Sequence, residues 1–352
     1  TSGVINDPHP YEDEFVLFEV FRDKQHEESG PLRPQPGSTP YDDVLEFIAT
    51  LNDPSNENYE GSVRLTFKNK FFGHISGLCS LTNWLDIENE YYTKLKALLA
   101  EDDAVFRNGK VRELNRDFDA VKKRLESYLT QIVDETRVKP IPSVKEIFDS
   151  LIEFNDVAYG KQKMFVESIL SRMIQIDKKD VVVEGQENDP DDLFNQSLEE
   201  QRHYVLKRLH DEHFKQTHCK PVDTLILNFN YTQTAQKLYA RMKDGIINIH
   251  GELGSARNPI IFGYGDELDD DYKRIERLQD NDFLENIKSV RYHETGNYRR
   301  LLGFIESEPY QVVTMGHSCG NSDRTLLNTL LEHSNCISVK VYYHQREDGT
   351  DD

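Results

Sequence analysis

Apolar positions in the middle of the chain repeat with a helical period. Between residues 111 and 133 they recur at spacings of three and four, which places them on one face of an α-helix. A further helix is expected to begin after Pro142, with Ser143 as its N-cap and Glu146 completing a capping box. The same periodicity predicts helices over residues 41–51, 81–99 and 193–214.

After residue 221 short apolar runs alternate with helical patterns. Strands alternating with helices imply crossover connections, and crossover connections join parallel strands. We therefore expect a mostly parallel sheet flanked by helices in this part of the chain. The predicted strands cover residues 223–229, 245–250, 259–265, 311–316 and 336–343, and the helices between the later ones cover 298–307 and 322–333.

The polar and apolar pattern divides the chain into an α/β core with a helical insertion. Residues 1–100 contain many turn formers and one β-like run at 14–21, and they are expected to be the N-terminal part of the core. Residues 101–215 form the predicted insertion. Residues 216–352 are the C-terminal part of the core, and ligands of such sheets bind beyond the carboxyl ends of the strands.

Composition narrows the class of protein. The formal net charge of −21 over 352 residues makes binding to nucleic acid or to an anionic membrane unfavourable. No apolar run reaches the roughly 18 residues of a transmembrane helix, and no signal-peptide pattern opens the chain. Four cysteines that do not cluster are typical of reduced thiols, so we expect a cytoplasmic protein without a disulfide framework.

Polar residues follow three of the predicted strands. Asn230 follows the first strand, His250 the second, and the turn from Gly316 to Ser318 follows the fourth. A single asparagine or histidine at such a position is usually a turn or cap residue. Three of them at successive strand ends are expected to meet in one crevice, which favours a functional site.

The segment "GHSCG" at 316–320 is literally G-x-S-x-G, the pattern of the nucleophile elbow of α/β-hydrolases. An elbow serine needs a histidine base and a carboxylate that follow it in the chain. The sequence ends 34 residues after Ser318, which leaves little room for both. The hydrolase interpretation is therefore a minor alternative. In the favoured one the glycines bring the backbone close to a ribose or phosphate, next to the free N–H groups of a helix N-terminus.

A family resemblance becomes visible once these motifs are considered together. The chain resembles the AbiH family of bacteriophage abortive infection proteins, which in turn resembles the sirtuin-like group of NAD-binding Rossmann-type proteins. The resemblance covers most of the chain. It depends on "TNWLDIEN" (82–89), "LNFNYTQT" (227–234), "NIHGEL" (248–253), "IIFGYGDE" (260–267) and "GHSCGNSD" (316–323).

The resemblance implies a Rossmann-like, mostly parallel sheet and a role for each matched residue. Asn230 would contact the nicotinamide ribose and orient a water molecule, and His250 would take a proton from a ribose hydroxyl. Gly316 and Ser318 would hold the adenosine half of NAD+, and Asp323 would either cap the following helix or reach the ribose. The full set expected to contact the nucleotide besides His250 and Asn230 is Tyr231, Gly251, Gly316, His317, Ser318 and Asp323.

The implied activity is antiphage defence in which the protein binds NAD+ and hydrolyses it to nicotinamide and ADP-ribose. A neutral imidazole suits this chemistry because it can withdraw a proton while positive charge develops on the sugar. The alternative is a non-catalytic nucleotide-binding sensor or scaffold that recognises a phage component or another defence protein, as a monomer or a homo-oligomer. Two departures from the family pattern bear on this choice: Thr232 replaces an acid, and the early glycine loop is not found. We expect the core to lack that first strand and loop, since the chain begins at Thr1 and not at Met.

No metal is expected. His210, His213, His218 and Cys219 lie close together in the sequence, but their spacing matches no structural zinc pattern. The acidic segment 265–272 is interpreted as a solvated loop.

Overall fold

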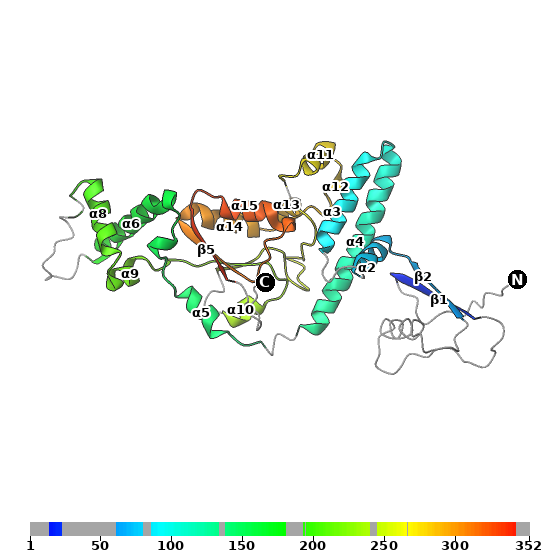
Figure 1. Ribbon diagram of the computed structural model, residues 1–352, viewed down its shortest axis with the longest axis horizontal. Coiled ribbons are helices and arrows are strands. Elements are labelled where there is room, and N and C mark those ends of the chain that lie inside the picture. Colours follow the sequence, from blue (N-terminus) through cyan, green and yellow to red (C-terminus); the bar gives the residue numbers. More distant parts are fainter. Residues whose placement is uncertain are drawn as a thin grey trace. The chain divides into compact units, whose positions relative to one another are not determined.

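The computed structural model describes residues 14–22, 61–79, 86–133, 138–180, 193, 195–239, 245–265 and 267–342. The predicted helix at 41–51 lies outside the described residues. The chain divides into two compact units, Thr1–Lys123 and Arg124–Asp352 (Figure 1). The domain boundaries expected at residues 100 and 215 stay predictions.

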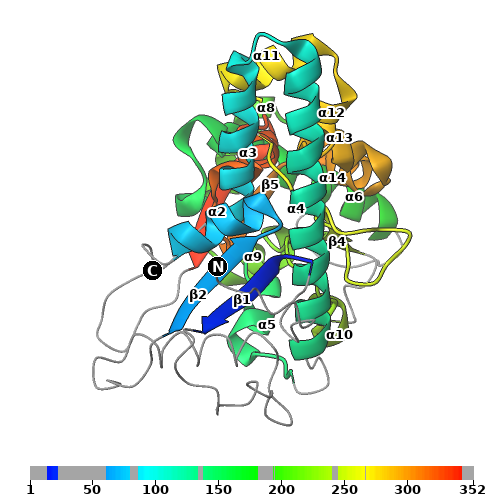
Figure 2. The same cartoon turned by 90° about the vertical axis from the view of Figure 1, so that its right-hand side faces the viewer.

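The first unit combines an antiparallel pair of strands with helices (Figure 2). Strand β1 pairs antiparallel with β2 along its whole length, from Val16 opposite Phe67 to Arg22 opposite Gly61. The β-like run at 14–21 is therefore confirmed as a strand. The elements are β1 (Val16–Arg22), β2 (Gly61–Phe67), α2 (Lys70–Cys79), α3 (Ile87–Ala97), the 3₁₀ turn Leu98–Ala100 and α4 (Ala104–Ile132), which continues into the second unit.

The predicted helix at 111–133 is the greater part of α4, and its apolar face packs in the first unit's core. Phe118 stacks on Tyr91 of α3 with ring centroids 4.1 Å apart, and Phe71 of α2 meets its edge at 5.6 Å. On the same helix the Asp117 carboxylate accepts the Lys70 N–H at 2.7 Å. Asp117 therefore caps the N-terminus of α2 from a distance of 47 residues along the chain.

In the second unit, helices between residues 162 and 218 pack around one apolar cluster. Burial of Phe165, Ile169 and Val205 in this cluster holds α6 and α8 together, and Ile337 of a later strand joins them. The elements are α5 (Pro142–Phe148), 3₁₀ turns at Phe154–Asp156 and Tyr159–Lys161, α6 (Gln162–Asp180), α8 (Leu198–Arg208) and α9 (Glu212–His218).

The predicted capping box at Ser143 is wrong. Helix α5 begins two residues earlier, with Ile141 at its N-cap and Pro142 in its first turn. Proline is suited to that position because its missing N–H would have no partner there. A capping box does occur at the start of α8, where Ser197 and Glu200 bond each other's backbone N–H groups.

The strands of the second unit form two parallel pairs. Strand β3 (Ile226–Asn228) pairs with β4 (Ile246–Asn248), and β5 (Tyr310–Met315) pairs with β6 (Cys336–Tyr342). The expectation of parallel strands is confirmed for these four, and the fold is a mixed α/β one. The helices of this region are α10 (Thr234–Leu238), α11 (Asp270–Leu278), α12 (Asn281–Leu284), α13 (Lys288–Arg291), α14 (Asn297–Ser307) and α15 (Arg324–Leu331), with 3₁₀ turns at Tyr292–Glu294 and Asn321–Asp323.

The predicted strand at 259–265 is wrong. Among the described residues this segment forms no strand: it contributes an isolated parallel bridge between Tyr264 and Ile287, and its Ile261 N–H donates to the His250 carbonyl. Its apolar residues are buried, because Ile261 packs in the same cluster as Ile247, Ile249 and Leu301. A short apolar run predicts burial more reliably than it predicts strand pairing.

Gly251 occupies a backbone position that other residues fit poorly. Its φ is +85°, and a Cβ at this position would lie 2.1 Å from the Pro259 carbonyl oxygen. We expect Gly251→Ala to destabilise the unit by roughly 1–3 kcal/mol or more, because the clash adds to the left-handed strain. Gly254→Ala is the matched control, with a φ of +68° and open space around it. Urea unfolding of both variants tests this, and equal losses of stability would contradict it.

Candidate functional site

The carboxyl ends of β3, β4 and β5 lie close together. Phe229, directly after β3, contacts the ring of His250 after β4 at a centroid distance of 5.2 Å. The same phenyl ring contacts His317, after β5, at 4.1 Å. The three strand ends therefore meet as predicted, through Phe229, His250 and His317. That Asn230 and Ser318 share one crevice with His250 stays a prediction.

A buried carboxylate lies at the centre of this region. Asp323 Oδ1 accepts a hydrogen bond from Lys288 Nζ at 2.8 Å and lies 3.0 Å from His250 Nε2. Its other oxygen lies 3.6 Å from His317 Nε2. Lys288 is 1% exposed and His250 is 5% exposed. Because solvent hardly reaches them, the Lys288 ammonium and the His250 ring compensate the charge of the Asp323 carboxylate in its place.

Asp323 stays ionised because its surroundings outweigh its burial. Burial alone would raise the pKa of this carboxyl. Hydrogen bonds from His250 and His317 and the charge of Lys288 act in the opposite direction and hold the pKa of Asp323 well below its usual range. The side chain does not cap α15, which was one of the two roles expected for it.

The carboxylate determines how His250 is oriented. An ionised carboxylate only accepts hydrogen bonds, so His250 must present a protonated Nε2 to Asp323. Tyr292 Oη lies 3.1 Å from the same nitrogen. A neutral His250 in this tautomer keeps its lone pair on Nδ1, and that nitrogen is the one able to take a proton.

The turn after β5 holds His317 in a similar way. His317 Nδ1 accepts the Cys319 N–H at 2.9 Å, which directs its protonated Nε2 toward Asp323. Gly316 has a φ of +64° and Cys319 one of +53°. Ser318 is exposed, and within the described ranges no hydrogen bond joins its hydroxyl to a histidine. The geometry gives no support to the nucleophile-elbow interpretation.

Asn230 and Gly251 have local roles in the structure. Asn230 is exposed, and its backbone N–H donates to Asn228 Oδ1 at 3.1 Å. Gly251 fits tightly against the backbone of residue 259. Tyr231 lies near the histidine site: its ring centroid is 6.5 Å from that of His250. Their contacts with a ligand stay predictions.

A network of asparagines supports the strand ends. Asn228 Nδ2 donates to Asn248 Oδ1 at 2.7 Å, and both side chains are buried in adjacent strands. Asn258 and Asn297 each donate to the Asn248 carbonyl at 3.2 Å, which ties two loops to β4. This network was not predicted from the sequence, although an asparagine inside an apolar run is a visible signal.

Lys288 and Tyr292 were also missed. Two backbone hydrogen bonds hold Lys288 and its neighbours next to Tyr264. The Lys288 N–H donates to the Tyr264 carbonyl, and the Tyr264 N–H donates to the Asn286 carbonyl. Nothing in the local sequence distinguishes Lys288 from a surface lysine. Its function depends on contact with Asp323, 35 residues later in the chain.

A search of the described residues finds no group of three or more histidine, cysteine, aspartate or glutamate side chains that could hold a metal ion. Among the same residues, no helix combines the length and the apolar character needed to cross a membrane.

The comparison with known families is decisive for the identity of the chain. Residues 38–344 match the family model described as bacteriophage abortive infection AbiH. The chain belongs to the AbiH family. The match includes both parallel strand pairs, His250 and Asp323. No curated protein and no solved structure matches this AbiH chain.

Replacing Asp323 by asparagine should destabilise this AbiH protein. Lys288 would then be a buried cation without its carboxylate, and removing one member of a buried pair costs roughly 3–5 kcal/mol. Since the pKa of Asp323 is depressed, its contribution is present above about pH 4 and is lost as the pH falls further.

Urea unfolding of wild type and Asp323→Asn between about pH 3 and pH 7 tests both points. We expect the difference in unfolding free energy to be largest near neutrality and to shrink in acid. Asp270→Asn removes a highly exposed carboxylate paired with Lys273 and should leave stability unchanged. A difference that stays constant with pH would show that the charge of Asp323 is not responsible.

Proposed function

We propose that this AbiH protein defends bacteria against bacteriophage by binding NAD+ and hydrolysing it to nicotinamide and ADP-ribose. The family match supports the defence role. One observation supports the chemistry: a buried histidine, His250, is paired with the ionised carboxylate of Asp323 at the carboxyl ends of parallel strands. Ligands of parallel α/β sheets bind at that edge.

The proposed reaction breaks the bond between the nicotinamide nitrogen and the ribose. Its electron pair neutralises the pyridinium ring, and the ribose carbon gains positive charge. His250 Nδ1 takes a proton from a ribose hydroxyl and so relieves that charge, while Asp323 stabilises the imidazolium that forms. A water molecule then adds to the ribose carbon and releases one proton, and the His250 imidazolium returns its proton to the ribose oxygen, which restores the hydroxyl of ADP-ribose and the neutral histidine.

The turn after β5 is suited to the remainder of the nucleotide. Gly316 has open space where a Cβ would be, so the backbone there can approach a ligand closely. The first N–H groups of α15 follow and favour an anionic phosphate. In this proposal Tyr231, Ser318 and Asn230 contact the nucleotide, and Asn230 orients the water molecule. The core would be Rossmann-like, as in sirtuin-like proteins.

The proposal places the protein in the bacterial cytoplasm, where NAD+ is available. A phage-derived component or a partner defence protein would act as the trigger. Light scattering of the purified protein measures whether it forms a homo-oligomer.

Purified protein incubated with NAD+ should release nicotinamide and ADP-ribose, measured by chromatography with and without phage lysate. His250→Ala should lower turnover by roughly 10²–10⁴-fold, the usual contribution of a general base. His293→Ala is the matched control, because His293 is an exposed histidine on the neighbouring turn. If wild-type protein neither binds nor consumes NAD+ under both conditions, the proposal fails.

A non-catalytic sensor is the second candidate function. It is favoured by the same geometry, since His250, Lys288 and Asp323 already compensate one another without a ligand. In that case protection in plaque assays should survive the conservative variant His250→Gln. Protection should instead be lost on altering helices of the 101–215 segment, for example by Tyr159→Ala, which removes a side chain 91% exposed. Loss of protection in His250→Gln alone would favour catalysis.

A further inference from the structure

Two side chains approach the same oxygen of the buried carboxylate. Lys288 Nζ lies 2.8 Å from Asp323 Oδ1, and His250 Nε2 lies 3.0 Å from that atom. All three residues are buried, so water contributes little to their solvation. The ammonium and the imidazole therefore share the charge of one carboxylate oxygen, and the ammonium reduces the negative charge that the imidazole meets.

The protonation state of His250 depends on how much negative charge it meets. A carboxylate at hydrogen-bond distance, with no cation beside it, stabilises the imidazolium and raises the pKa of a histidine. An imidazolium carries a proton on both ring nitrogens and cannot take another. His250 can therefore act as a base near neutral pH only where the charge of Asp323 is largely compensated. Lys288 is placed to compensate it.

His317 and Tyr292 also face this group, and neither replaces the lysine. His317 Nε2 lies 3.6 Å from Asp323 Oδ2, and its Nδ1 accepts the Cys319 N–H at 2.9 Å. A ring that accepts through Nδ1 is neutral, so His317 brings a hydrogen-bond donor and no charge. Tyr292 Oη lies 3.1 Å from His250 Nε2, and a phenol is uncharged near neutral pH.

A second carboxylate, that of Glu252, lies two residues after His250 in the chain. Burial raises the pKa of Glu252, but hydrogen bonds from three amide side chains outweigh burial and lower it from its usual value. Two of these bonds come from Gln233 at 3.0 Å and Asn258 at 3.2 Å. Amides on neighbouring loops thus satisfy the Glu252 charge, and the carboxylate within hydrogen-bond distance of His250 Nε2 is that of Asp323.

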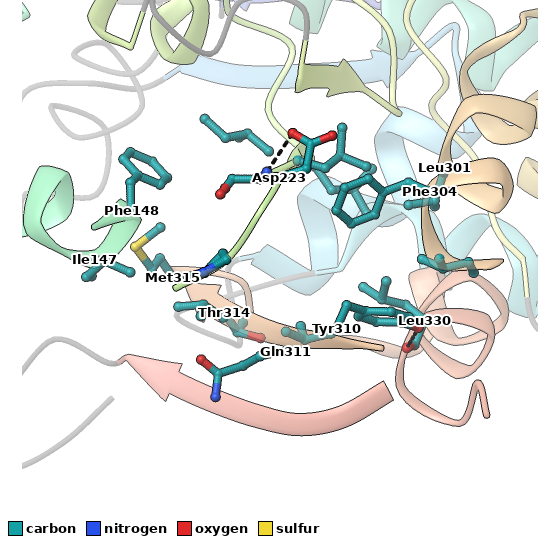
Figure 3. A pocket seen from close by; sticks show the side chains of 18 of the residues that line it. Ile147, Phe148, Asp223, Leu301, Phe304, Tyr310, Gln311, Thr314, Met315 and Leu330 are labelled. Atoms are coloured by element: carbon teal, nitrogen blue, oxygen red, sulfur yellow. Dashed lines mark hydrogen bonds between the residues drawn. The ribbon is translucent and has the colours of Figure 1, made fainter. Parts of the chain in front are cut away.

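Lys288 lies apart from the cavity that adjoins the site. The cavity has a volume of about 670 Å³, and His317 lines it together with apolar side chains such as Phe304 and Leu330 (Figure 3). Within the described part of the chain, neither Lys288 nor Asp323 is among its lining residues. A molecule in this cavity would meet His317 without touching Lys288, so the lysine would influence it through the side chains that it bonds.

We propose that Lys288 is a positioning residue, whose ammonium compensates the Asp323 carboxylate and thereby keeps His250 neutral, with its proton on Nε2 and its lone pair on Nδ1. The hydrogen bond from His250 to Asp323 still fixes the tautomer, while the shared charge is too small to hold a second proton on the ring. This inference deepens the proposed function and rests on the role of His250 as its base.

Titration of the wild-type protein tests the inference without any variant. Histidines labelled with ¹⁵N are followed by NMR from about pH 5 to pH 9, a range centred near the ordinary histidine pKa. The His250 signals are assigned by their loss in His250→Gln. We expect a neutral ring with its proton on Nε2 at about pH 7.5. An imidazolium at that pH, or a proton on Nδ1 of the neutral ring, would overturn the proposal.

Lys288→Met removes the charge and keeps a side chain of similar length. We expect the pKa of His250 to rise by about one unit or more in this variant, because Asp323 then acts on the ring without compensation. The double variant Lys288→Met/Asp323→Asn removes both charges and should reverse the rise. Lys273→Met is the matched control, because it removes an exposed lysine that pairs with Asp270.

The double variant also guards against a failure of Lys288→Met to fold, since it leaves neither charge of the pair buried without its partner. Circular dichroism verifies that each variant is folded. A His250 titration that is unchanged in folded Lys288→Met would overturn the proposal. So would a rise of the pKa that persists in the double variant, because that rise would not come from Asp323.

Turnover of NAD+ gives a second readout. In Lys288→Met the acidic limb of the profile of kcat/KM against pH should move upward by the same interval as the His250 titration, with activity regained at higher pH. An equal loss of activity at every pH would indicate a merely structural role and would contradict the proposal. The NMR titrations use no NAD+. If they give the expected shifts while NAD+ is not consumed, the proposed function fails and the control of His250 by Lys288 stands.

Discussion

The buried carboxylate of Asp323 is the constraint on which the arrangement of the second unit depends. An ionised carboxylate can be buried only where donors and cations surround it. Its partners come from three different segments: Lys288 at the start of α13, His250 after β4 and His317 after β5. Compensation of one charge therefore holds together the strand ends that would face a ligand. The same contacts orient both histidines through Nε2.

The asparagine network extends this support to the strands and loops. Asn228 and Asn248 bond to each other across β3 and β4, and Asn258 and Asn297 attach loops to the end of β4. Buried polar groups of this kind specify one arrangement, since any other leaves amides unsatisfied. The short strands, three residues each in β3 and β4, are thus held by side-chain bonds as well as by their ladder.

The family match informs the biological process, whereas the geometry of the site informs the chemistry. The family match concerns the biological process, abortive phage infection. The pairing of His250 with Asp323 concerns chemistry, and it permits a base at Nδ1 while also serving as internal charge compensation.

Local pattern in the sequence was sufficient for much of the fold, including the strand at 14–21, the helix within α4, the parallel pairs and the meeting of the strand ends at His250 and His317. It misplaced the N-cap of α5, and it predicted a strand at 259–265 where only one bridge forms. Periodicity reports which face of a segment is buried, and this information is local. Lys288 and Tyr292 acquire their roles only through contacts 35 and 42 residues away, and residues 221–230 line a cavity of about 670 Å³ together with residues 307–317. Such contacts are decided by tertiary packing, because burial of a charge depends on which distant segments surround it.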